Sequence, residues 1–81
     1  MGEKTQEFRQ AALNLFEKTL GCFREHDFEG AYEVAKAMED LAVDAPGGVG
    51  RMEVHKTRSM GIAMSMAAGA IIQGEEREDE D

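Results

Sequence analysis

The sequence predicts an all-α fold, namely a small three-helix domain with antiparallel helices. Apolar residues recur every three or four positions over residues 5–24, 28–44 and 51–73, which is the spacing of one face of an α-helix. No stretch shows the alternation of β-branched residues that is typical of a strand. Residues 44–50, which contain the only proline and three of the nine glycines, separate the second helix from the third.

The first predicted helix carries most of the bulky side chains. Three of the four phenylalanines lie within it, and two overlapping apolar stripes run along it. One of these stripes consists of Leu13, Phe16, Leu20 and Phe23. We expect the large side chains of this helix to interdigitate with the small side chains of the third helix.

The second predicted helix is amphipathic and begins after a short polar break. Asp27 is the expected N-cap, because its carboxylate can accept hydrogen bonds from backbone N–H groups two or three residues further on. Glu29 adds a favourable negative charge to the first turn. Pro46 disfavours the helical conformation of Ala45, so the helix ends before it.

Residues 59–72, which are rich in methionine, alanine and glycine, contain no charge and no aromatic ring. Their apolar arc is wider than one face, which indicates burial on several sides. Gly61, Ser65 and Gly69 lie four residues apart, and each glycine lowers helix stability by about 0.5–1 kcal/mol relative to alanine. This favours a close approach of another backbone, the alternative being that the glycines only weaken the helix. The stretch is shorter than the roughly 20 residues that span a membrane, so we expect no membrane insertion.

The size of the chain favours oligomerisation. A core built from 81 residues is modest, and Cys22 is the only cysteine, so no intramolecular disulfide can reinforce it. We therefore expect a homo-oligomer, with a dimer as the commonest closed form, assembled as a helical bundle around residues 59–72. The predicted oligomer interface consists of Met60, Gly61, Met64, Ser65, Ala68, Gly69 and Ile72.

The net charge of −8 is concentrated at one end of the chain. Residues 75–81 contain six acidic residues and one arginine, and they contain no apolar residue. We expect a single helical domain over residues 1–74, followed by a disordered acidic tail. No clustered basic surface typical of nucleic-acid binding is present in the sequence, so no nucleic-acid partner is expected.

The sequence offers few candidates for chemistry. His26 and His55 are far apart, and neither lies in a Glu-x-x-His or His-x-x-x-His pattern, so we expect no metal site, no cofactor and no catalytic residue. One basic cluster stands near the start of the third helix. It could contact an acidic partner or an anion, or it could be a mixed solvated face. The cluster consists of Arg51, His55, Lys56 and Arg58.

These features favour a non-enzymatic, oligomeric helical module for protein–protein interaction, of the adaptor, chaperone-like or regulatory kind. A single cysteine and the lack of a secretory signal favour a cytoplasmic location. The alternative is a small ligand- or metal-binding enzyme or sensor, with a site at a subunit interface near His26 and His55.

Overall fold

The computed structural model describes residues 2–79 of the chain and the side chains of residues 2–76. These residues form three helices, α1 (Glu3–Arg24), α2 (Phe28–Val43) and α3 (Arg51–Asp79). No strand occurs within residues 2–79. The all-α, three-helix fold predicted from the apolar spacing is therefore confirmed.

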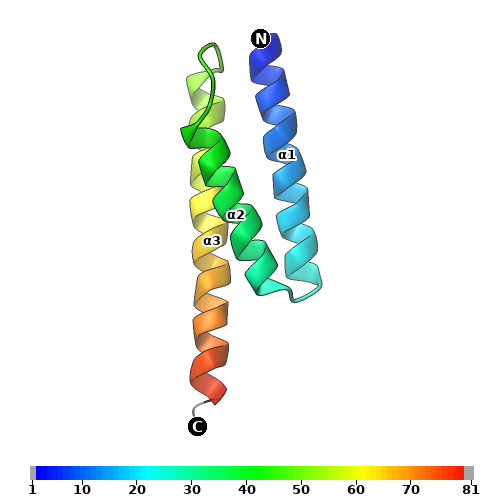
Figure 1. Ribbon diagram of the computed structural model, residues 1–81, viewed down its shortest axis with the longest axis vertical. Helices are drawn as coiled ribbons and strands as arrows, with labels where there is room; N and C mark the ends of the chain where they lie inside the picture. Colours follow the sequence, from blue (N-terminus) through cyan, green and yellow to red (C-terminus); the bar gives the residue numbers. More distant parts are fainter. Residues whose placement is uncertain (1, 80–81) are drawn as a thin grey trace.

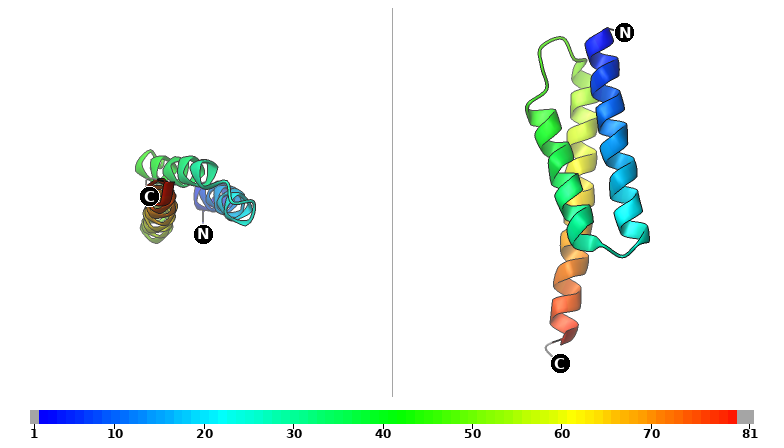
Figure 2. Two further views of the ribbon diagram at one scale, coloured as in Figure 1. Left: turned by 90° about the horizontal axis from the view of Figure 1, so that it is seen from below. Right: turned by 45° about the vertical axis from the view of Figure 1, so that its right-hand side comes forward.

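Helix α2 packs between the other two helices and runs antiparallel to both (Figure 1). Consequently α1 and α3 run in the same direction, and both begin at the end of the molecule that carries the α2–α3 loop. Seen along their length, α1 and α3 project to the same side of α2 and diverge from each other (Figure 2). They meet near their first turns, where side chains of Thr5 and Arg9 reach the start of α3. Helices α1 and α3 therefore lie on the same side of α2 and approach each other mainly near their first turns.

The turn between α1 and α2 closes with two backbone hydrogen bonds. The N–H of His26 donates to the Phe23 carbonyl at 3.1 Å, and the N–H of Asp27 donates to the Cys22 carbonyl at 2.8 Å. This pair of bonds is a Schellman motif, which requires a left-handed residue after the helix, and His26 has a φ of 59°. The Asp27 carboxylate then accepts a hydrogen bond from the Gly30 N–H at 3.0 Å. The predicted N-cap of the second helix is confirmed.

The glycine-rich loop after α2 is tied to the first turns of α1. Oγ1 of the buried Thr5 accepts a hydrogen bond from the Gly50 N–H at 3.0 Å and donates to the Gly48 carbonyl at 3.4 Å. Gly48 has a φ of 98°, and a residue with a side chain would be strained in this backbone conformation. These bonds hold the start of α3 beside the start of α1. Helix α2 itself ends at Val43, one residue before its predicted end.

The core follows α2 and is built mainly from small side chains. In the described part of the chain, the buried apolar residues are Phe8, Met38 and five alanines. Gly61 of α3 lies so close to α2 that an added Cβ would stand 2.9 Å from the Ala35 carbonyl oxygen. Small residues of α3 thus pack against α2. The interdigitation expected between α1 and α3 is absent over most of their described lengths, because the two helices diverge on one side of α2.

Helix α3 continues six residues beyond its predicted end at residue 73 and reaches Asp79. Gly74 lies inside the helix and does not end it, because a glycine inside a helix costs only about 1 kcal/mol. No proline follows, and the exposed Glu75 and Glu76 are good helix formers. The segment predicted as a disordered acidic tail, residues 75–81, is therefore helical through Asp79. Residues 80 and 81 lie outside the described part of the chain.

Candidate functional site

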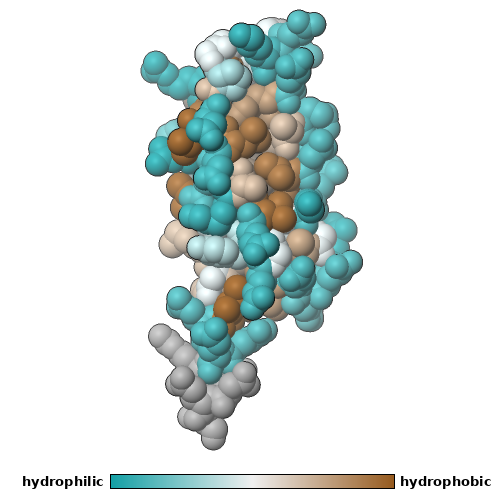
Figure 3. All heavy atoms as spheres, viewed as in Figure 1, coloured by the Kyte–Doolittle hydropathy of each residue, from teal (hydrophilic) through white to brown (hydrophobic). Residues whose placement is uncertain are grey.

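An apolar groove lies between α1 and α3, on the side of α2 toward which both helices project. On the opposite face, where α2 lies nearest the viewer, polar side chains run down the middle and the right-hand edge of the view, and apolar ones show between them and on the left (Figure 3). The groove consists of a hollow of about 420 Å³ between the two helices and an adjoining hollow of about 450 Å³ that only residues of α1 line; the two hollows share Leu13 and Phe16. We call it the α1–α3 groove. Its lining residues are Arg9, Ala12, Leu13, Phe16, Glu17, Leu20 and Arg24 of α1 and Glu53, Lys56, Thr57 and Met60 of α3.

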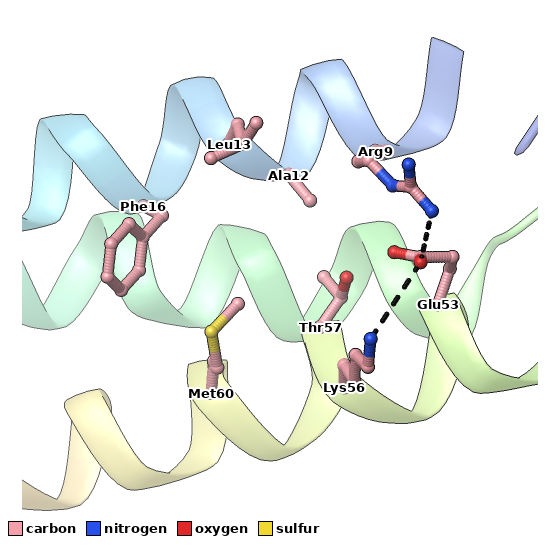
Figure 4. A pocket seen from close by; sticks show the side chains of 8 residues that line it. All are labelled: Arg9, Ala12, Leu13, Phe16, Glu53, Lys56, Thr57 and Met60. Carbon is pink, nitrogen blue, oxygen red and sulfur yellow. Dashed lines mark hydrogen bonds and ion pairs between the residues drawn. The ribbon is translucent and has the colours of Figure 1, made fainter. Parts of the chain in front are cut away.

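The walls of the α1–α3 groove carry large apolar side chains that the chain covers only in part. Leu13 on one wall is 45% exposed and Met60 on the other is 37% exposed. Phe16 and Leu20 are half-buried beside Leu13. Phe16 and Met60 project into the space between the two helices (Figure 4). The stripe of Leu13, Phe16 and Leu20 that sequence spacing assigned to a core therefore lines an open groove.

A charged cluster closes the end of the α1–α3 groove where the two helices meet. Arg9 Nη2 of α1 donates to Glu53 Oε1 of α3 at 2.6 Å, and Lys56 Nζ lies 4.0 Å from the same oxygen (Figure 4). The hydrogen bond from Arg9 is the main cause that lowers the pKa of the Glu53 carboxyl below its ordinary value of 4.5. The same contact raises the pKa of Arg9. Glu53 is therefore ionised at neutral pH and bridges two cations.

A second, shallower apolar area lies on the other side of α3, along its seam with α2. Tyr32, Ile62 and Met66 contribute to a hollow there, and Met66 is 69% exposed. Lys36 Nζ and Glu39 Oε2 form an ion pair at 3.1 Å beside it. The hydrogen bond to Glu39 raises the pKa of Lys36. We call this area the α2–α3 seam.

Part of the predicted oligomer interface packs within the chain. Gly61, Ser65 and Ala68 are buried on the face of α3 that meets α2. Ser65 Oγ donates to the Ile62 carbonyl one turn earlier at 3.0 Å. The close backbone approach expected on this face occurs at Gly61, between two helices of one chain. These three residues already have neighbours and are not open to another copy.

The remaining residues of the predicted interface are more accessible. Met60 is exposed at the α1–α3 groove, whereas Met64, Gly69 and Ile72 are half-buried. A Cβ added at Gly69 would stand 3.8 Å from the Tyr32 ring, an ordinary contact distance that indicates no tight helix crossing there. Association of copies through this helix stays a prediction, and of the seven residues predicted for the interface only these four are accessible.

The predicted basic cluster is divided between two sides of α3. Lys56 belongs to the α1–α3 groove, as described above. Arg51, His55 and Arg58 are exposed, and their spacing of four and three residues brings them together on another side of the helix. An anion or acidic partner would therefore meet the last three without Lys56.

The two histidines lie toward opposite ends of the molecule. His26 is in the α1–α2 turn and stacks on Phe28, with 5.7 Å between ring centroids and 20° between ring planes. His55 is in the second turn of α3, near the other end (Figure 1). Among the described residues, no group of three or more His, Cys, Asp or Glu side chains is placed to hold a metal ion. A site that used both histidines would need residues from two chains.

Sequence reasoning missed the Arg9–Glu53 contact and the groove that it closes. The two residues are 44 positions apart, and helical spacing carries no information about which helices become neighbours. Comparisons of the chain with protein-family models, curated proteins and solved structures give no match. No helix within the described range combines the length and apolar character that crossing a membrane requires.

Proposed function

We propose that the chain is a non-enzymatic, oligomeric helical module for protein–protein interaction, of the adaptor, chaperone-like or regulatory kind, and that the α1–α3 groove is its docking surface. The observation that carries this proposal is the exposure of Leu13 and Met60 on facing walls of one groove. An apolar groove between two helices accepts the apolar face of a third, which is an established mode of recognition. The described residues supply no further helix to cover it.

The charged groups of the groove support binding better than chemistry. A general acid or base works best with a pKa near the working pH, whereas Arg9 lowers the pKa of Glu53. Glu53 is already engaged by Arg9 and lies near Lys56, so its first role is to hold α1 beside α3. The apolar walls then supply the binding energy, because burying such side chains yields about 25 cal/mol per Å² of apolar surface.

The setting proposed for this module is the cytoplasm, and its simplest oligomer is a homodimer. Cys22, the single cysteine, is half-buried on α1 and suits a reducing compartment. Closed two-fold pairs are the commonest oligomers of soluble proteins.

Photo-crosslinking in cells tests the proposed docking surface. A benzophenone side chain replaces Leu13 in the groove or, as the control, Val43, an exposed apolar residue at the end of α2. A groove that docks a protein yields a covalent adduct of discrete mass from position 13 and a much weaker one from position 43. Equal adducts from both positions, or none from position 13, would show that the groove is not a docking surface.

A further inference from the structure

One copy of the chain leaves more large apolar side chains outside its core than inside it. The buried apolar residues of the described part are Phe8, Met38 and alanines, while Leu13 and Met60 are exposed beside the half-buried Phe16. A chain of 81 residues buries a modest fraction of its surface, and its core alone gives little stability. A cover that is present whenever the chain is folded would therefore stabilise the fold most. A second copy meets this condition wherever the protein is made.

Helix α1 has the shape and the chemistry that the α1–α3 groove accepts. It is a 22-residue helix with the apolar stripe Leu13, Phe16 and Leu20, bordered by Glu17 and Arg24. It packs on α2 along one side and leaves this stripe toward the groove. Two copies related by a two-fold axis could each place α1 along the groove of the other, and the same surface would then serve both sides of the contact.

The charges at the α1–α3 groove permit two copies to meet there. The whole chain carries −8, yet the groove is lined by three cations (Arg9, Arg24, Lys56) and two carboxylates (Glu17, Glu53). The excess negative charge therefore lies on other surfaces, and pairing through the groove keeps it away from the contact. Arg9, Lys56 and Glu53 already interact with one another, so a copy turned by a two-fold axis can meet opposite charges at Glu17 and Arg24. A strongly acidic or strongly basic partner would meet both cations and carboxylates at the groove, so its charge would not be complemented there.

We infer that a second copy of the same chain occupies the α1–α3 groove, with the two grooves facing each other across a two-fold axis. This inference rests on the proposed function and names its partner. It replaces the small-residue face of α3 by the groove as the contact between copies, because Gly61, Ser65 and Ala68 are already covered by α2.

Sedimentation equilibrium over a micromolar concentration range tests the inference with two matched variants. Leu13→Glu places a carboxylate in the groove, and Met66→Glu places the same group on the α2–α3 seam. Both positions are exposed in a single copy, and glutamate is a good helix former. The wild type should be a dimer. Leu13→Glu should weaken dimerisation by at least about tenfold, as loss of a central contact does, while Met66→Glu stays dimeric.

A mapping experiment on the otherwise unaltered dimer does not depend on the folding of a charged variant. Equal amounts of ¹⁵N-labelled and unlabelled protein, each with benzophenone in place of Leu13, are mixed and irradiated. Crosslinked peptides of mixed isotope content should join position 13 to α1 or to the first half of α3 of another copy. Crosslinks to the surface around Met66 would overturn the inference.

Two further results would also overturn it, and they separate it from the proposed function. Dissociation caused by Met66→Glu and not by Leu13→Glu would place the dimer contact on the α2–α3 seam and leave an oligomeric interaction module in place. A wild-type monomer across micromolar concentrations excludes the second copy. If position 13 then forms no specific adduct in cells either, the proposed function fails as well.

Discussion

Replacing Gly61 with alanine should destabilise the fold, although alanine is the better helix former. The new Cβ would stand 2.9 Å from the Ala35 carbonyl oxygen, 2.9 Å from the Glu39 amide nitrogen and 3.0 Å from the Glu39 Cγ. Two of these atoms belong to the backbone of α2, so a change of side-chain rotamer cannot relieve the contact. The helix-propensity gain of about 0.8–1.0 kcal/mol competes with an overpacking cost of about 1–3 kcal/mol. We expect a net loss of up to about 2 kcal/mol.

The same substitution elsewhere in α3 provides the matched controls. At Gly69 the nearest atom to a new Cβ is in the Tyr32 ring at 3.8 Å, which is ordinary van der Waals contact. At Gly74 nothing lies within 4 Å. Alanine at either position should therefore raise the free energy of unfolding by about 0.5–1 kcal/mol through helix propensity alone. Three chemically identical changes in one helix are thus predicted to differ in sign.

Urea unfolding followed by circular dichroism, at one fixed protein concentration, measures all three variants. A fixed concentration matters because association with a second copy would add to the measured stability. In a thermal scan, each kcal/mol corresponds to a shift of about 4–8 °C for a domain of this size. If Gly61→Ala is as stable as Gly69→Ala, then α2 and α3 do not approach as closely at Gly61 as the structure has them.

Three more predictions concern the turn, the ion pair and the charge of the chain. The left-handed conformation of His26 (φ 59°) should tolerate asparagine, whereas His26→Val should lose about 1–2 kcal/mol in chemical unfolding relative to His26→Asn; equal stabilities would contradict the left-handed assignment. Because the hydrogen bond from Arg9 lowers the folded-state pKa of Glu53, the pair stabilises the fold above pH 4.5, and this contribution is lost as the pH falls through the lowered pKa. Thermal scans of wild type and Glu53→Gln should therefore differ at neutral pH and converge in acid, and a constant difference would exclude an ionised pair. Finally, two copies of net charge −8 repel, so added salt should tighten the association measured by sedimentation, and weakening by salt would show that opposite charges meeting at the contact outweigh this repulsion.

The helices were predictable because their signals are local. Apolar spacing, the proline and glycines of residues 44–50 and the capping Asp27 each act within a few positions along the chain. The end of α3 was not predicted, because Gly74 weakens a helix without ending it when good helix formers follow. The expected close approach at Gly61 was real, but the sequence could not tell whether the approaching backbone belonged to the same chain.

The candidate site could not be predicted, because it depends on which helices become neighbours. The stripe of Leu13, Phe16 and Leu20 looks the same in sequence whether it faces a core or an open groove. The pairing of Thr5 with Gly50 and of Arg9 with Glu53 decides that α1 and α3 meet at one end and diverge along the rest. Contacts between residues 44 or 45 positions apart leave no periodic trace in the sequence.

The wide apolar arc of α3 is explained by its having one full neighbour in the chain instead of two. Helix α2 covers the face that contains Gly61 and Ala68, and α1 reaches only the first turns of α3. Met60 is left on one flank and Met66 on the other.

The two flanks differ in shape, because the flank with Met60 faces α1 across a groove, whereas the one with Met66 faces solvent beside the α2–α3 seam. An occupant of the groove contacts two walls at once, so it removes more apolar surface from water per residue than one lying on the seam. Association should therefore begin at the groove, and the seam remains open to a second partner once the groove is filled.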